Sequence, residues 1–348
     1  MRRRKDNPLK LPDRVYPKHG AFYYVHKNGK WERLGTDVVE ARRKGNSLNN
    51  TVASYGIMSY YLDEFISHCE KRFQKGTLAA LTLKGYKRDV IPLKLFFGDM
   101  LPADVEPKHI AQYLDIGAEN DRPVRANREK SCLSACFTWM IRTGEGGVKL
   151  NPCFGVRRNR ETARDRYVED SELHAIKSIA VKQVRALLDL IYRTLQRPED
   201  IIRWTRKDII IKKEPSGEER KVIRNIQNKT GAFIDIAISP EIEEIFAELQ
   251  IDKLDMDTTI IRRNDGHPYT YDGLCSMLTR YVEKTEVPSF GFYDMKGKGA
   301  TDMWLNGIPL EQVQILCGHK SIRTTEIYVK RRWRQTVEPN KIVIKKTD

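Results

Sequence analysis

Short apolar runs separated by polar turns dominate residues 1–50. These runs are rich in aromatic and β-branched residues, a composition typical of β-strands. They are Val15–Tyr16, Ala21–Val25 and Trp31–Leu34. Asn28-Gly29 lies between the last two runs and is a strong hairpin signal, because both residues tolerate positive φ. The pattern predicts a small, basic, three-stranded antiparallel sheet followed by a short helix over about residues 37–44.

Residues 51–155 carry apolar residues at helical spacing, as in Ile57, Tyr61 and Phe65. The spacing predicts an all-α domain of four helices whose apolar stripes form the core. Pro92 is expected to interrupt the second helix, because proline lacks the N–H that a helix interior needs. The third helix is expected to begin at Val105-Glu106-Pro107, and the fourth to cover about residues 124–142.

Residues 156–166 are polar, charged and almost free of apolar residues, so they are predicted to be an interdomain linker. Its arginines could follow a DNA backbone, or the linker could be solvated and without contacts. Residues 167–348 mix helical periods with alternating strands, which predicts an α+β domain. The expected strands are 209–212, 221–225, 233–238 and 341–346; the expected helices begin near 169, 181, 198, 241, 271, after Thr301, and at 322.

The formal net charge is +15 and the sequence pI is about 9.4, which favours a polyanionic partner, most often nucleic acid. A merely basic soluble protein is the alternative reading of the charge. Six cysteines occur without a CxxC pair, so we expect reduced thiols and no zinc site. We also expect no signal peptide and no membrane-spanning segment, because no run approaches about 18 apolar residues.

The most informative stretch for chemistry runs from Phe292 to Tyr328. Ser321 is a plausible N-cap, so a short helix is expected from Ile322, with His319 in the preceding turn and Tyr328 near its far end. Basic residues surround the tyrosine: Arg323, Lys330, Arg331 and Arg332. A phenol, with a pKa of about 10, is a poor nucleophile by itself. Among cations and opposite a phosphodiester, it can attack phosphorus and form a covalent ester.

Leu316-Cys317-Gly318-His319, followed nine residues later by Tyr328, resembles the C-terminal box of the tyrosine recombinases, the phage integrase family. The resemblance extends to most of the chain and is strongest from Arg197 to Tyr328. It implies a lambda-type layout of three domains: a small β-rich N-terminal arm-binding module over residues 1–50, an all-α core-binding four-helix domain over 51–155, and an α+β tyrosine-recombinase catalytic domain over 167–348.

The resemblance implies a catalytic set drawn from four segments. Arg197, within Gln196-Arg197-Pro198-Glu199-Asp200, matches the first arginine of the family, whose guanidinium can bind two phosphate oxygens. Lys229 lies in a turn between two expected strands, where the family places a general-acid lysine. His319 is expected to bind a non-bridging oxygen or to help remove the proton of Tyr328, the expected nucleophile.

Two positions depart from the family pattern. The family has His-x-x-Arg before Gly-Ala-Thr, whereas this chain has Tyr293 and Lys296 before Gly299-Ala300-Thr301. Lysine keeps the positive charge but loses the planar fork of arginine, which removes about 1.5–3 kcal/mol if one charge-assisted bond is lost. Lys298 could compensate for that loss. Tyr293 can donate one hydrogen bond but cannot act as a base at neutral pH.

The resemblance further implies double-stranded DNA as the partner, a homo-tetramer on DNA, a C-terminal tail that packs on a neighbouring protomer, and no metal or other cofactor. The basic residues expected to bind DNA are Arg2, Arg3, Arg4, Lys84, Lys87, Arg88, Arg125, Arg128 and Arg323, and Lys130 is expected on the same exposed face as those of the helical domain. An accessory DNA-bending protein is compatible with this layout. The expected location is the cytoplasm of a bacterial host, with the nucleoid.

The sequence therefore predicts a site-specific DNA recombinase that forms a 3′-phosphotyrosyl intermediate without metal or ATP, in the setting of prophage integration. Lys296 and Tyr293 leave a second hypothesis open, a DNA-binding relative of the family with impaired catalysis. A nicking-closing topoisomerase is a third.

Overall fold

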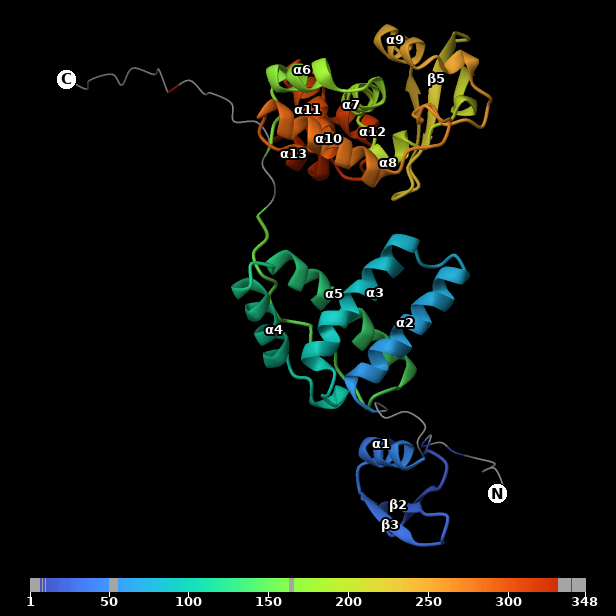
Figure 1. Cartoon of the computed structure of the whole chain (residues 1–348), viewed down its shortest axis with the longest axis vertical. Helices are drawn as coiled ribbons and strands as arrows, with labels where there is room; N and C mark the ends of the chain where they lie inside the picture. Colours follow the sequence, from blue (N-terminus) through green and yellow to red (C-terminus); the bar gives the residue numbers. More distant parts are fainter. Residues whose placement is uncertain are drawn as a thin grey trace, which may run out of the picture. The chain divides into compact units, whose positions relative to one another are not determined.

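The computed structural model describes residues 7, 9, 11–49, 56–162, 166–330 and 339, and of Tyr328 and Lys330 the backbone alone. The chain divides into two compact units, residues 1–163 and 164–348 (Figure 1). This division falls inside the predicted linker. The predicted DNA-binding residues Arg2, Arg3 and Arg4 and the predicted strand 341–346 lie outside the described residues.

The N-terminal sheet has the predicted three antiparallel strands, in the order β1-β2-β3. They are β1 (Val15–Lys18), β2 (Ala21–Val25) and β3 (Trp31–Gly35). Helix α1 (Val38–Leu48) begins after Asp37, whose carboxylate accepts a hydrogen bond from the Glu40 amide at 2.7 Å. The helix ends four residues later than predicted and packs on the sheet through Ala41, against Val15 and Leu34.

Four long helices form the second part of the first unit, as predicted: α2 (Met58–Gln74), α3 (Ala80–Phe97), α4 (Pro107–Glu119) and α5 (Pro123–Thr143), with a 3-10 turn η1 (Pro102–Asp104) before α4. The predicted interruption at Pro92 is wrong, because α3 continues through it. Proline disfavours a helix interior. Here Val90, Leu93 and Phe97 are buried on the same helix, and their packing outweighs the lost hydrogen bond.

The start of the predicted linker makes hydrogen bonds to this helical part, although most of its side chains are exposed. The side-chain amide of Asn127 on α5 donates to the Asn159 carbonyl and accepts from the Asn159 N–H, both at 2.9 Å. The ammonium of Lys130 donates to the Val156 carbonyl and is buried, which lowers the pKa of Lys130. The expectation that Lys130 lies on the exposed basic face is therefore wrong, because the segment after α5 covers it.

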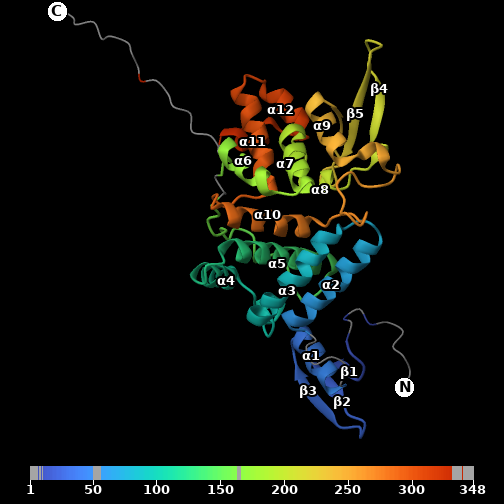
Figure 2. The same cartoon turned by 45° about the horizontal axis from the view of Figure 1, so that its top comes forward.

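The second unit combines helices with one small antiparallel sheet of order β4-β5-β6. Its strands are β4 (Ile209–Lys213), β5 (Glu219–Ile226) and β6 (Phe233–Ala237), and β4 and β5 form a hairpin that projects from the helices of this unit (Figure 2). Its helices are α6 (Asp170–Ile179), α7 (Lys182–Thr194), α8 (Pro198–Ile201), α9 (Pro240–Leu249), α10 (Tyr271–Thr285), α11 (Phe292–Leu305), α12 (Leu310–Cys317) and α13 (Ile322–Lys330), with 3-10 turns η2 (Arg206–Asp208) and η3 (Ile251–Lys253).

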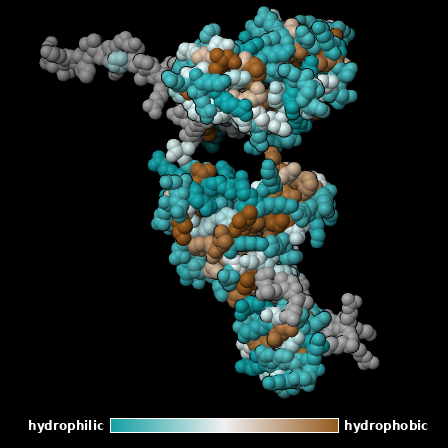
Figure 3. All heavy atoms as spheres, viewed as in Figure 1, coloured by the Kyte–Doolittle hydropathy of each residue, from teal (hydrophilic) through white to brown (hydrophobic). Residues whose placement is uncertain are grey.

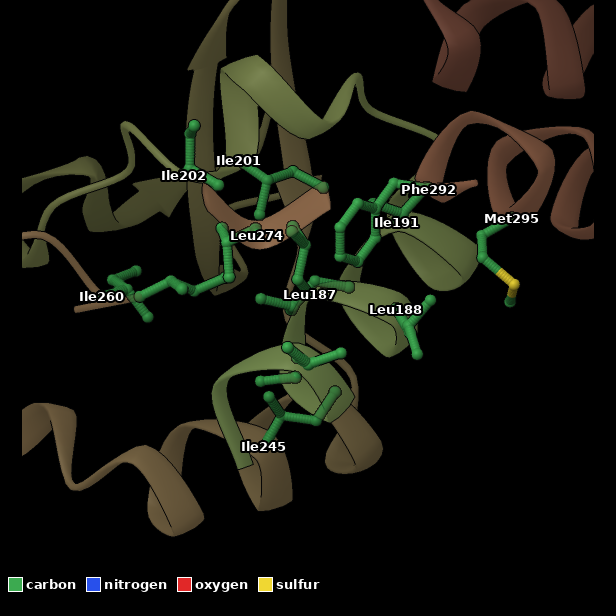
Figure 4. Close-up of a cluster of buried hydrophobic side chains, with 14 of the residues drawn as sticks. Leu187, Leu188, Ile191, Ile201, Ile202, Ile245, Ile260, Leu274, Phe292 and Met295 are labelled. Carbon is green, nitrogen blue, oxygen red and sulfur yellow. The ribbon is translucent and has the colours of Figure 1, made fainter. Parts of the chain in front are cut away.

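Helix α11 begins at Phe292, nine residues before Thr301, whereas the sequence predicted a helix only after Thr301. Phe292 and Met295 enter the main hydrophobic core, and Figure 4 shows Phe292 beside Ile191 of α7. Gly299 allows the close approach of α11 to α7. A Cβ atom there would lie 2.2 Å from the Tyr192 carbonyl oxygen. The missing side chain of Gly299 thus permits the short distance between these helices.

The surface in Figure 3 is mostly hydrophilic, with separate hydrophobic patches. In the described part of the chain, no helix has the length and apolar character needed to cross a membrane. All six cysteines are free, and five of them are buried. Among the same described residues, no group of three His, Cys, Asp or Glu side chains is placed to hold a metal ion.

Candidate active site

Arg197 stands at the break between α7 and α8, where it is the N-cap residue of α8. Pro198 fixes the first turn of α8, as predicted. The guanidinium donates to Gln227 Oε1 at 2.7 Å and lies 3.8 Å from the buried carboxylate of Asp200. With 16% of its side chain exposed, Arg197 can still meet a ligand from the surface.

Lys296 lies on α11 and is only 2% exposed. Its ammonium donates to the Cys317 carbonyl at 3.2 Å, and Gln227 Nε2 donates to the same oxygen at 3.0 Å. Gln227 therefore links Arg197 to the carbonyl that Lys296 binds. Burial, the largest cause, and the positive charge of Arg197 lower the pKa of Lys296.

Lys298 does not compensate at this position, contrary to the expectation from sequence. Residues two apart on a helix point to different faces. The Lys298 ammonium contacts the carboxylates of Asp170 at 2.7 Å and Asp302 at 3.1 Å, and the Tyr167 hydroxyl at 3.1 Å. Burial lowers the pKa of Lys298, but these hydrogen bonds outweigh it and raise the pKa. Lys298 therefore holds the start of the second unit against α11.

His319 follows Gly318, whose φ of +67° ends α12 in the left-handed region. A Cβ atom at position 318 would lie 2.4 Å from Gln227 Nε2, so only glycine fits this close turn. The His319 Nδ1 atom lies 3.0 Å from the hydroxyl of Thr325 on α13. Burial, followed by the charges of Lys296 and Arg197, lowers the pKa of His319 to about 4. The imidazole is therefore neutral near pH 7 and retains one N–H donor.

The lowered pKa of His319 predicts a pH-dependent stability. Above the unfolded pKa of about 6.5, both states carry neutral imidazole and His319 contributes no pH dependence. As the pH falls from there toward about 4, the unfolded chain takes up a proton that the folded chain does not, so stability is lost. Thermal unfolding of wild type and His319→Gln is expected to show a smaller loss between pH 7 and 5 in the variant. Parallel curves would contradict this.

Lys229 occupies the turn between β5 and β6, as the sequence predicted. Its side chain is exposed, and in the part of the chain that the structure describes no hydrogen bond or ion pair holds its ammonium. The neighbouring Thr230 hydroxyl donates to Gln227 Oε1 at 2.7 Å, which ties this turn to Arg197. Lys229 can thus reach a ligand without first breaking a described contact.

Tyr293, at the first turn of α11, donates its hydroxyl hydrogen to Glu199 Oε2 at 2.8 Å. The single hydrogen bond that this phenol can donate is therefore made within the protein. Glu199 belongs to the same turn of α8 as Arg197. Tyr293 thus braces α8 against α11 in this structure, and Glu199 acts as its acceptor.

Tyr328 lies in α13, three residues after Thr325. Thr325 and Val329 are each 0% exposed and anchor this helix, Thr325 through His319 and Val329 in a cluster with Ala300 and Cys317. Arg323 is exposed on the same helix. The helix of the predicted nucleophile is therefore fixed to the predicted histidine.

Within the described part of the first unit, the predicted DNA-binding residues lie on α3 and α5, and most of them are engaged in ion pairs. The pairs are Lys87–Glu70 at 2.5 Å, Arg88–Asp89 at 3.4 Å, Arg125–Asp89 at 2.9 Å and Arg128–Glu161 at 3.7 Å, while Lys84 is exposed. Arg128 and Arg88 remain 61% and 66% exposed, so their donors can also reach a ligand. Arg125 is held more tightly, by Asp89 and by Glu129 at 3.4 Å.

Sequence reasoning missed the buried amides behind this cluster. Gln227 and Asn225 are at most 1% exposed at the end of β5, and both donate to the Gln196 side chain at 2.8 Å. Trp204 donates to Asn225 at 2.8 Å. The sequence contains one signal for them, because Asn225 and Gln227 stand at alternate positions before Lys229. Alternate residues of a strand face the same side, and polar residues that face the core must find hydrogen-bond partners.

The sequence of this chain is similar to those of known proteins. Residues 167–334 match the model of the phage integrase family. The tyrosine recombinase XerC of Thermodesulfovibrio yellowstonii is 23% identical over 288 residues, which cover 77% of this chain and 91% of that protein. The tyrosine recombinase XerD of Ralstonia nicotianae is 22% identical over 284 residues, covering 75% and 87%.

Solved structures give the same fold. A lambda integrase tetramer bound to a Holliday junction matches with a TM-score of 0.68 and 20% identity over 95% of this chain and 99% of that one. A lambda integrase dimer bound to a COC′ core site matches with a TM-score of 0.67 and 20% identity over 98% and 100%. The fold is thus that of a multidomain integrase.

Over residues 167–334 the chain matches the phage integrase family, and the relatives that it resembles over about three quarters of its length are tyrosine recombinases. By class it is a site-specific DNA recombinase.

Proposed function

We propose that this chain cuts and rejoins DNA through a covalent bond to Tyr328. The supporting observation is that residues distant in the sequence share one hydrogen-bonded cluster. Arg197 and Lys296 are joined through Gln227 and the Cys317 carbonyl, and both lower the pKa of His319. His319 in turn contacts the helix that contains Tyr328. Cations and N–H donors gathered in this way suit a phosphate whose charge grows in the transition state.

In the proposed reaction, the Tyr328 oxygen bonds to phosphorus while the bond from phosphorus to the 5′-oxygen breaks. The phenol releases its proton to solvent, and Lys229 gives a proton to the departing 5′-oxygen. Arg197 and Lys296 stabilise the pentavalent phosphorus, and neutral His319 donates to a non-bridging oxygen. The products are a 3′-phosphotyrosyl ester and a free 5′-hydroxyl. The 5′-hydroxyl of a partner strand then attacks the phosphotyrosyl ester and releases Tyr328. Because the ester conserves the energy of the phosphodiester bond, the proposed reaction needs no ATP. Because protein cations stabilise the charge on phosphorus, it needs no metal.

We further propose how the chain engages its partners. The basic residues on α3 and α5 and Arg323 would bind the DNA backbone, and the N-terminal sheet would bind a separate arm-type site. Four protomers would assemble on two duplexes during prophage integration, together with a DNA-bending protein. The predicted strand 341–346 would pack on a neighbouring protomer. Among the described strands, β6 pairs only with β5, so its other edge can accept such a strand.

The alternative is a DNA-binding relative with impaired catalysis, and two observations favour it. Tyr293, at the position where the family has histidine, donates its hydrogen bond to Glu199. Lys296, in place of arginine, is 2% exposed and bound to a carbonyl. Either residue could therefore fail to reach a phosphate.

Nicked suicide sites, from which the cut strand end diffuses away, distinguish these functions. A recombinase leaves a protein–DNA adduct that resists boiling in detergent, and mass spectrometry of the digested adduct should place the nucleotide on Tyr328. Binding without an adduct would favour the impaired relative. Relaxation of supercoiled plasmid without defined sites would favour a nicking-closing topoisomerase.

Replacing Lys296 by methionine is expected to reduce cleavage and to leave the fold equally or more stable. Loss of a charge-assisted bond to the phosphate predicts about a 10- to 100-fold slower single-turnover rate. Removing a buried ammonium is often neutral or stabilising, by about 1 kcal/mol or more. The Cys317 carbonyl keeps its hydrogen bond from Gln227, so no acceptor is left unpaired. Adduct kinetics and thermal unfolding measure the two effects.

Lys298→Met is the matched control. Lys298 is also buried on α11, but it is paired with Asp302 and Asp170, so its removal should destabilise by on the order of 2 kcal/mol. Its cleavage rate at a temperature where the protein remains folded should change little. Wild-type cleavage by Lys296→Met would remove Lys296 from the catalytic set.

A further inference from the structure

Gln227 is completely buried at the end of β5 and uses all four hydrogen-bonding positions of its amide. Its Oε1 atom accepts from Arg197 at 2.7 Å and from the Thr230 hydroxyl at 2.7 Å. Its Nε2 atom donates to Gln196 Oε1 at 2.8 Å and to the Cys317 carbonyl at 3.0 Å. An amide offers two donors and two acceptor lone pairs, so none is left unused.

The partners fix the orientation of this amide. A guanidinium can only donate and a backbone carbonyl can only accept, so Arg197 must face the oxygen of Gln227 and Cys317 must face its nitrogen. Methionine, of similar length, would make none of these bonds. Glutamate would replace Nε2 by an oxygen, which would face the acceptor oxygens of Gln196 and Cys317 without a hydrogen between them. The position therefore requires the amide, rather than merely a side chain of the right size.

Three segments that carry predicted catalytic residues meet at this one side chain. They are the α7–α8 turn with Arg197, the β5–β6 turn with Lys229, and the turn with His319. Gly318 allows the third segment to approach, because a Cβ atom there would lie 2.4 Å from Gln227 Nε2.

Gln227 also affects the distance between the Arg197 guanidinium and the carboxylate of Asp200. The Oδ2 atom of Asp200 is buried without a hydrogen-bond partner and lies 3.8 Å from the Arg197 guanidinium, while Oδ1 accepts from the Asn228 amide at 2.9 Å. Without the bond to Gln227, the guanidinium could move onto this carboxylate and form a short ion pair. Such a pair would compete directly with a phosphate for the same N–H groups.

We propose that Gln227 is a positioning residue for the recombination reaction: it holds Arg197 away from Asp200 and aligned with the Lys229 and His319 turns. This inference rests on the proposed function, because the alignment matters only if the cluster acts on a phosphate. In this proposal Gln227 acts through Arg197 and the two turns, and does not itself touch the DNA.

The test compares Gln227→Met with Gln183→Met on nicked suicide sites at saturating DNA. Gln183 is also a buried glutamine of the second unit, 6% exposed and bonded to Asn264, with no described link to Arg197. Gln227→Met is expected to form the adduct about 10- to 100-fold more slowly, because the Arg197 guanidinium would be misplaced. Its DNA affinity should change by about twofold or less. Gln183→Met should keep the wild-type rate. Equal rates in the two variants would overturn the proposal.

Two further variants separate positioning from general loss of structure. Gln227→Glu retains an acceptor for Arg197, so it should fold, yet it should also cleave at least about 10-fold more slowly; a wild-type rate would overturn the proposal. Asp200→Asn combined with Gln227→Met should cleave about threefold faster or more than Gln227→Met alone, because the competing charge is gone. No gain would overturn the role assigned to Asp200. If wild type itself forms no adduct, the proposed function fails, and this inference with it.

Discussion

Tyr328→Phe is expected to abolish the covalent protein–DNA adduct completely, while DNA binding is retained. Phenylalanine lacks the oxygen that forms the ester, so no residual chemistry is expected at this position. The helix should keep its place, because Thr325 and Val329, both 0% exposed, anchor α13. Adduct formation on nicked suicide sites and DNA affinity by mobility shift measure the two properties separately.

Tyr281→Phe is the matched control for this experiment. Its hydroxyl accepts a hydrogen bond from the Val181 amide at 3.3 Å, away from the cluster around Arg197. This variant should form the adduct at the wild-type rate. An adduct in Tyr328→Phe would mean that another nucleophile attacks the DNA, and the assignment of Tyr328 would be wrong.

Arg197→Ala should have the second largest effect, slowing cleavage by about 10²–10³-fold at saturating DNA. That is the usual effect of removing one preorganised donor from a site that stabilises developing negative charge. Arg197→Lys should fall between wild type and alanine, since it keeps the charge and loses the planar fork. Alanine should also destabilise the fold by about 1–3 kcal/mol, because Asp200 would lose its nearby cation while buried.

Arg185→Ala serves as the control for loss of an arginine in the same unit. Arg185 donates to the Ala180 carbonyl at 2.6 Å and pairs with Glu248, so its removal should affect stability and leave the cleavage rate unchanged. Single-turnover rates and thermal unfolding of both variants make the comparison. If Arg197→Ala cleaves within about threefold of wild type, the cationic cluster is not the phosphate site.

Most elements could be predicted from the sequence because their signals are local. Turn residues such as Asn28-Gly29 and periodic apolar residues such as Val184, Leu187 and Leu188 determine short-range geometry. The prediction failed at Pro92, where core packing outweighs a local preference, and before Thr301, where glycine, lysine and aspartate conceal the start of α11. In both places tertiary contacts decided the structure.

For the candidate site too, the sequence identified the residues, but their contacts are seen only in the folded structure. Spacing and resemblance identified Arg197, Lys229, Tyr293, Lys296, His319 and Tyr328 as residues to consider. Lys296 and Lys298 look equivalent in the sequence, yet one faces the Cys317 carbonyl and the other faces Asp170 and Asp302. The hydrogen bond from Tyr293 to Glu199 joins residues 94 positions apart, so no local pattern announces it.

The order of amino acids alone gives the charge of the chain, most of its helices and strands, and the residue types available for phosphate chemistry. Long-range contacts in the folded chain determine which cation is buried, which is paired, and that one glutamine joins three distant segments. This difference arises because helix and turn preferences act over a few residues, whereas burial and hydrogen-bond partners depend on segments that only folding brings together.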